Sequence, residues 1–103
     1  MKQMLEQAQQ MQQRIGDLQR DLAMRRYEAS SGGGMVIAVV SGQLRVLEIK
    51  IEPSLVENRD REMIQDLTAA AVNAALEKAQ RGAQEEFARL GGGLNIPGLP
   101  GSG

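Results

Sequence analysis

The 103-residue sequence contains no cysteine, no histidine and no tryptophan, and its aromatic residues are limited to Tyr27 and Phe87. Without cysteine the chain can form neither a disulfide nor a reactive thiolate. Without histidine it lacks the commonest general base, and without both residues it lacks the commonest zinc ligands. No paired carboxylates stand in a recognisable catalytic motif. We therefore expect a protein that is not an enzyme and that needs no metal or cofactor, and no small-molecule substrate is evident.

Long apolar runs and an excess of charge are missing as well. No stretch is long enough to span a bilayer, and the N-terminal residues MKQMLEQAQQ do not form a secretory signal. These features predict a cytoplasmic protein with no membrane partner. The formal net charge is −1, so the overall charge gives no indication of a nucleic-acid partner.

The segment MVIAVVSGQLRVLEIKIE at residues 35–52 predicts two β-strands joined by a turn. Its apolar residues fall on both faces of this hairpin, whereas a half-exposed antiparallel strand would be apolar on one face only. A second copy of the chain could cover the second face, and burial in a dimer would add to a core that has few aromatics. We therefore expect a homodimer, with an interface formed by Val36, Ala38, Val40, Leu44, Val46, Ile49 and Ile51.

Two long helices are predicted on either side of this hairpin. Residues 1–26 carry a coiled-coil-like seam whose members are spaced alternately by four and three residues: Met4, Ala8, Met11, Ile15, Leu18 and Leu22. A helix of this length exceeds what a short hairpin can cover, so one end should project or pair with another helix. The second helix is expected from about Arg59 to Leu90, with Asn58 as its N-cap. Its alanine-rich stretch at residues 68–76 would allow a close approach to a sheet or helix.

The remaining segments are short. Tyr27–Ser31 is predicted to form a strand, and Gly32–Gly34 a turn into the hairpin. Residues 1–90 should form a single domain. Residues 91–103, GGGLNIPGLPGSG, are expected to be a flexible tail because of their glycine and proline content. The alternative is that Leu94, Ile96 and Leu99 dock on a partner.

Several motifs in this order resemble the YbaB/EbfC family of bacterial nucleoid-associated proteins. They are MKQMLEQAQQMQ at 1–12, SGGGMV at 31–36, VLEIKIEPSLVE at 46–57, EMIQDLTAAAVNAA at 62–75 and NIPGLP at 95–100. The resemblance implies an α+β fold with an αβββα protomer, in which two long helices flank an antiparallel three-stranded sheet. It also implies an intertwined homodimer with projecting helical arms, which binds double-stranded DNA at the nucleoid and contributes to nucleoid organisation and gene regulation.

In this family, DNA contacts are attributed to basic residues on the projecting helices. Arg14, Arg20 and Arg26 are the first candidates here, because none has an acidic residue four positions away. Lys78, Arg81 and Arg89 form a second set. With so few cations and no aromatic platform for base stacking, phosphate contacts with little base readout are expected. The alternative function is a protein–protein interaction module without DNA binding, which would use the glutamine-rich first helix and the tail.

Overall fold

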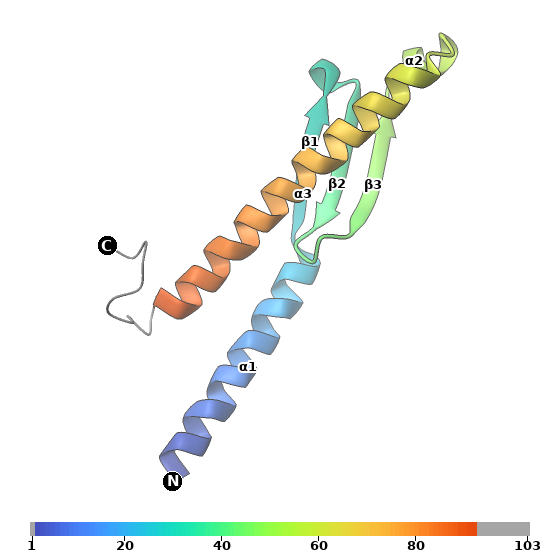
Figure 1. Ribbon diagram of the computed structural model, residues 1–103. Coiled ribbons are helices and arrows are strands. Elements are labelled where there is room, and N and C mark those ends of the chain that lie inside the picture. Colours follow the sequence, from blue (N-terminus) through green and yellow to red (C-terminus); the bar gives the residue numbers. More distant parts are fainter. Residues whose placement is uncertain (1, 93–103) are drawn as a thin grey trace.

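The computed structural model describes residues 2–92 and contains a three-stranded antiparallel sheet with flanking helices (Figure 1). Its sheet has the order β1-β2-β3. The elements in chain order are α1 (Lys2–Met24), β1 (Arg26–Ser31), the 3₁₀ turn η1 (Gly32–Gly34), β2 (Val36–Ser41), β3 (Val46–Ile51), α2 (Pro53–Glu57) and α3 (Arg61–Gly92). The expected α+β class and element order are confirmed. Most of the expected tail, residues 93–103, lies outside the described residues.

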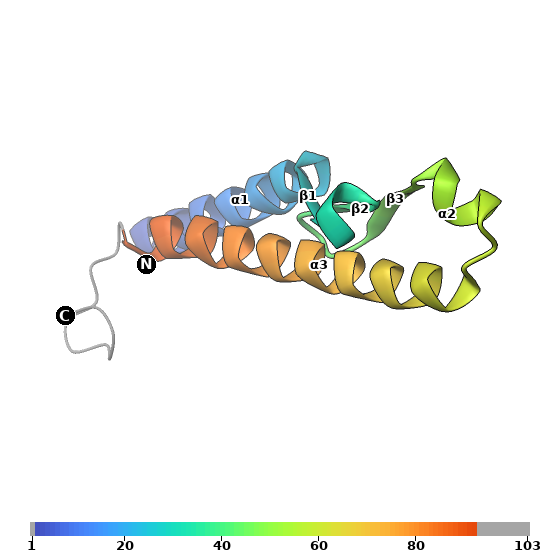
Figure 2. The same cartoon turned by 90° about the horizontal axis from the view of Figure 1, so that it is seen from above.

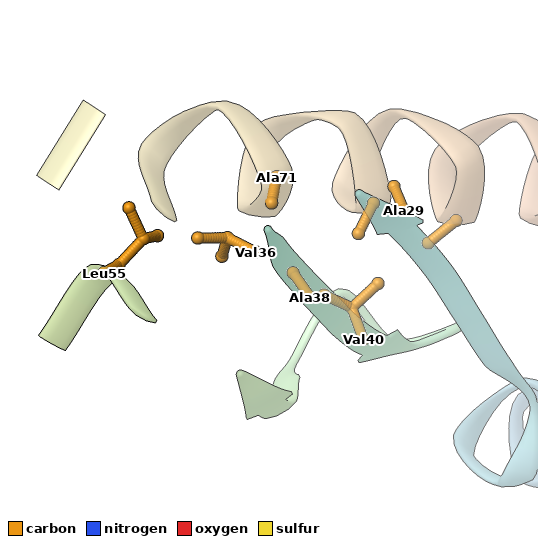
Figure 3. Close-up of a cluster of buried hydrophobic side chains, with 8 residues drawn as sticks. Ala29, Val36, Ala38, Val40, Leu55 and Ala71 are labelled. Carbon is orange, nitrogen blue, oxygen red and sulfur yellow. The ribbon is translucent and has the colours of Figure 1, made fainter. Parts of the chain in front are cut away.

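The core lies between α3 and one face of β1 and β2 (Figure 3). Ala71, Ala75 and Ala79 recur every four residues, so they share one face of α3, and each is fully buried. Because these side chains are small, the helix axis can approach the sheet closely. Opposite them, β2 contributes the fully buried Val36, Ala38 and Val40. The alanine-rich stretch therefore has the packing role that its composition predicts.

The other face of the sheet carries no helix, and its apolar residues lie only on the central strand. Ile37 is half-buried and Val39 is buried. Their neighbours in the strand register are polar, with Glu28 and Glu48 on either side of Val39 and Lys50 opposite Ile37. These side chains cover the central strand without a further layer. The apolar surface left open to solvent lies instead on β3.

The first helix leaves the end of the sheet and extends away from it (Figures 1 and 2). Its last turns are anchored by the buried Leu18 and Leu22, whereas Met4 near its beginning is 74% exposed. The molecule is consequently elongated, with extents of 67 × 28 × 15 Å. The prediction that one end of the first helix projects is confirmed. Neither of the two long helices in the described part has an apolar stretch suited to crossing a bilayer.

The start of α3 differs from the sequence-based expectation. Arg59 has a positive φ of 54°, which interrupts the helix between α2 and α3. Asp60, rather than Asn58, caps α3, because its Oδ1 accepts a hydrogen bond of 3.3 Å from the N–H of Met63. Asn58 instead ends α2, where its backbone N–H bonds the carbonyl of Ser54. At its other end α3 continues to Gly92, two residues beyond the expected boundary.

Candidate nucleic-acid interface

Two helical arms leave the same end of the sheet: α1 and the C-terminal part of α3, residues 78–92 (Figures 1 and 2). Two glycines allow the close packing from which the arms start. A Cβ on Gly42 would lie 2.5 Å from the carbonyl oxygen of Leu22 in α1. A Cβ on Gly82 would lie 2.7 Å from the ring of Tyr27 in β1. Glycine at these positions lets α1 contact the β2–β3 turn, and lets α3 pack against β1.

Three arginines lie at the end of the sheet where the arms begin, and we call them the arginine cluster: Arg25, Arg26 and Arg45. The N–H of Gly42 bonds the carbonyl of Arg25 at 3.2 Å, and the N–H of Ser41 bonds the carbonyl of Arg45 at 2.8 Å. Arg26 is the register partner of Ser41. Backbone pairing therefore brings Arg45 to the same end of the sheet as Arg25 and Arg26, which are adjacent in sequence and point to opposite faces of the sheet.

Two members of the arginine cluster are paired with carboxylates. Arg25 donates from Nη1 to Oε1 of Glu86 at 2.8 Å, and Arg26 donates from Nη2 to Oε2 of Glu48 at 3.4 Å. The pKa of Arg25 is raised, chiefly by the charge of Glu86 and next by a side-chain hydrogen bond with Tyr27. Arg45 makes no ion pair within residues 2–92.

Of the three first-choice arginines, only Arg14 is without an ion pair in the described part of the chain. Arg20 pairs with Asp17, three residues earlier on α1, and Arg26 pairs with Glu48 across the sheet. A spacing of four residues predicts neither ion pair. Asp17 is three residues from Arg20, and Glu48 lies on a different strand from Arg26. Both pairs are exposed, so they contribute little to stability and phosphate can compete for the arginines.

The second set of candidates lies on the α3 arm. Lys78 donates to the backbone carbonyl of Glu28 at 2.9 Å, which ties it to β1. Arg81 is within 3.9 Å of Glu77, and Arg89 donates to Glu86 at 3.1 Å. Glu86 thus accepts hydrogen bonds from both Arg25 and Arg89. All three cations are exposed, but each is already engaged within the chain.

The residues predicted for the dimer interface fall into two groups. Val36, Ala38 and Val40 are fully buried beneath α3 of their own chain, so in this structure they offer no surface to a partner. The others belong to β3 or to the turn before it: Leu44, Val46 and Ile49 are exposed and Ile51 is half-buried. A register shift opposite Val39 and Val40 brings Val46, rather than Leu47, opposite Val40.

Sequence reasoning did not select Arg25 or Arg45 as candidates. Arg25 has Asp21 four residues earlier and was therefore assigned to a helix-surface pair, and Arg45 lies in the predicted hairpin rather than on a helix. These two residues come close because of the way the strands pair, and the spacing of residues along a helix gives no information about strand pairing. In the described residues, no group of three or more acidic side chains is placed to hold a metal ion.

Comparison with known proteins agrees with this architecture. The model of the YbaB/EbfC DNA-binding family matches residues 1–94. Among similar proteins, a nucleoid-associated protein of Syntrophobacter fumaroxidans is 45% identical over 92% of this chain and 86% of its own length. One from Thermoanaerobacter pseudethanolicus is 47% identical over 93% of this chain and 86% of its own.

A solved structure, that of an uncharacterized Helicobacter pylori protein, superimposes with a TM-score of 0.64 at 22% identity. The match covers 78% of this chain and 93% of that protein, and it shows a shared fold. The family and its nucleoid-associated members are DNA-binding proteins rather than enzymes, which confirms the expectation of a non-enzymatic protein. On the agreement of motifs, fold and relatives, the chain belongs to the YbaB/EbfC DNA-binding family.

Proposed function

We propose that this protein binds double-stranded DNA as a homodimer, mainly through phosphate contacts, and contributes to nucleoid organisation and gene regulation. The observation that supports this most directly is the arginine cluster at the start of the two arms. Family membership and the names of the relatives support DNA as the partner. Phosphate contacts suit this surface, because the arms present several cations and a single aromatic side chain, Phe87, which is too little for a base-stacking platform.

The number of available cations sets the expected salt dependence. If Arg14 and the arginine cluster contact phosphate, a dimer offers twice that number of contacts. Each neutralised phosphate changes the slope of log K against log salt by about −0.9, so full engagement of eight arginines gives a slope of about −7. Binding should therefore weaken steeply as salt rises, with little dependence on DNA sequence.

The dimer is proposed to form on β3. This strand is at the edge of the sheet, and an unpaired edge with apolar side chains is a natural site for association. Val46 and Ile49 are 48% and 40% exposed, and α3 packs mainly on β1 and β2 rather than over them. Cover from a second copy would remove this apolar surface from water, at about 25 cal/mol per Å² of apolar area.

DNA binding is tested by the anisotropy of a fluorescent duplex at several salt concentrations. Arg14→Ala combined with Arg45→Ala removes two unpaired cations from each protomer, and should make the slope less negative by about 4 per dimer. The matched control removes the same charge with Arg59→Ala and Arg61→Ala, at the opposite end of the sheet (Figure 1). No binding of the unaltered protein at low salt, or equal losses in both double variants, would contradict the proposal.

Dimerisation is tested by light scattering in the same buffers. Ile49→Asp places a charge in the proposed interface, and because this position is 40% exposed the monomer should still fold. Lys50→Asp is the control, since it introduces the same side chain on the other face of β3. A dimer-sized mass for the protein and the control, with a monomer-sized mass for Ile49→Asp, is expected. A monomeric unaltered protein would rule out this dimer.

A protein–protein interaction module remains the second candidate function. It is favoured by the exposed apolar residues near the beginning of α1, where Met4 and Leu5 have no cover in the described part of the chain. The DNA experiment distinguishes the two functions. If the protein is a dimer but does not bind the duplex at low salt, the interaction module is the function that remains.

A further inference from the structure

A large groove separates the two arms, and the turn between β2 and β3 forms one end of it. Its volume is about 770 Å³. The side chains and backbone that line it come from α1, the turn and α3: Gln19, Leu22, Gly42, Gln43, Leu44, Gln80, Ala83, Gln84 and Phe87. None of these residues is ionisable, although the arginine cluster is nearby.

The chemistry of this groove differs from that of a phosphate site. Leu44 and Phe87 are exposed by 43% and 45% and provide apolar contact area. Four glutamines provide amide groups that can each donate and accept hydrogen bonds. Apolar contacts, including one aromatic ring, combined with neutral hydrogen-bonding groups suit an extended, uncharged peptide, and proline-rich segments commonly dock on aromatic side chains. A phosphate would find no cation among the lining residues.

We infer that residues 94–100 of the same chain, LNIPGLP, bind in this groove. This segment has no ionisable side chain, and it carries three large apolar residues, Leu94, Ile96 and Leu99. Pro97 and Pro100 favour the extended polyproline conformation, which leaves backbone carbonyls free for the glutamine amides. The inference goes beyond the proposed function and does not depend on it.

The position of the chain end makes this binding geometrically feasible. Phe87 lies five residues before the end of α3 at Gly92, a rise of about 7.5 Å, and Gln80 lies about 18 Å before it. In a polyproline conformation, residues 94–100 extend about 22 Å, enough to run back along the groove towards the β2–β3 turn. The residue that follows α3 is Gly93, and because glycine has wide conformational freedom the chain could reverse direction there without strain.

Covalent linkage also favours this occupant. A segment tethered by a short linker has an effective concentration in the millimolar range, so even weak contacts would keep it bound. Binding would cover Phe87 and Leu44, and would hold the two arms at a fixed separation. A free peptide or a second copy of the chain would have to compete with this local segment.

The test uses the full chain without DNA and exploits the absence of cysteine. Ser102→Cys provides a single attachment site for a nitroxide, which broadens NMR signals of nearby nuclei. We expect broadening of the side-chain amides of Gln43 and Gln19, at the sheet end of the groove. The matched control adds Leu94→Ser, Ile96→Ser and Leu99→Ser to the same labelled chain, and the broadening at Gln43 and Gln19 should then be lost.

Two results would overturn the inference. Broadening confined to the last turn of α3, and equal in the labelled protein and its control, would show that the segment does not enter the groove. Broadening of Gln43 in an isotope-labelled chain mixed with a separate spin-labelled chain would show a second copy as the occupant. Because the measurement is made without DNA, its result does not depend on whether the protein binds DNA. Either proposal can therefore be refuted while the other is supported.

Discussion

Arg25, the residue that follows α1, forms an ion pair with Glu86 of α3: its Nη1 donates to Oε1 of Glu86 at 2.8 Å, across a sequence separation of 61 residues. Arg89 donates to the same oxygen at 3.1 Å. The Glu86 side chain is only 13% exposed, whereas Arg25 and Arg89 are 45% and 73% exposed. Two arginines whose side chains face solvent therefore share one partly buried carboxylate.

Glu86→Gln should strengthen DNA binding, because it releases Arg25 and Arg89 from an anion with which phosphate must compete. If one arginine of each protomer gains a phosphate contact, the slope of log K against log salt becomes more negative by about 2 for a dimer. Anisotropy titrations over a range of salt would measure this change.

Glu77→Gln is the control for this variant. It removes the same charge from α3, but the one ion pair of Glu77 within residues 2–92 is with Arg81, at 3.9 Å, and both side chains are exposed. We expect a smaller effect on affinity, since that pair restrains its arginine weakly. Equal strengthening by the two variants would indicate a general effect of net charge rather than release of the arginines at Glu86.

Glycine-to-alanine changes should have opposite effects on the two long helices. Alanine is favoured over glycine in a helix by about 1 kcal/mol. At Gly16 the new Cβ would meet only the end of the Arg20 side chain, at 3.9 Å, so Gly16→Ala should increase helicity and stability. At Gly82 it would lie 2.7 Å from the Tyr27 ring, and overpacking of about 1–3 kcal/mol should outweigh the helical gain.

Thermal unfolding followed by circular dichroism, at a fixed protein concentration, measures both variants. A change of 1 kcal/mol corresponds to about 4–8 °C in a domain of this size. A rise in melting temperature for Gly82→Ala would mean that Tyr27 does not pack against α3 as described.

The helices and strands were largely predictable because the sequence patterns that indicate them involve residues close together in the chain. The short apolar run from Met35 predicts a strand that is apolar on both faces, and the spacing of Leu18 and Leu22 predicts the buried face of a helix. The cover of the second sheet face was not predictable in this way. It depends on which side chains of β1 and β3 stand beside Ile37 and Val39, and strand pairing decides that.

The candidate site was less accessible to sequence reasoning than the fold. Pairing at a spacing of four correctly suggests the Glu77–Arg81 contact, but it misses Arg20 with Asp17 and Arg26 with Glu48. The arginine cluster arises from hydrogen bonds between segments that are far apart in sequence, so it could not be predicted from the spacing of residues along a helix. The spacing of four also pairs Arg89 with Glu85, whereas in the structure Arg89 pairs with Glu86, and the contact of Glu86 with Arg25 requires the tertiary fold.

Ala75→Leu should strongly destabilise the protein. Ala75 is fully buried between α3 and the sheet, and a larger side chain would force α3 away from β2. Overpacking of this kind costs about 1–3 kcal/mol. Ala70→Leu places the same side chain at an exposed position of α3, where little change is expected. Chemical denaturation of the two variants compares them, and similar stability would argue against close contact between α3 and the sheet.

The cap of α3 gives a direct choice between the sequence-based and the structural description. Asp60→Ala should lower the free energy of unfolding by about 1 kcal/mol, because it removes the side-chain oxygen that accepts from the N–H of Met63. Asn58→Ala should have a smaller effect, since Asn58 uses its backbone N–H at the end of α2, and alanine retains that group. Denaturation measured in parallel distinguishes them, and a larger loss for Asn58→Ala would place the start of the helix where the sequence pattern predicted it.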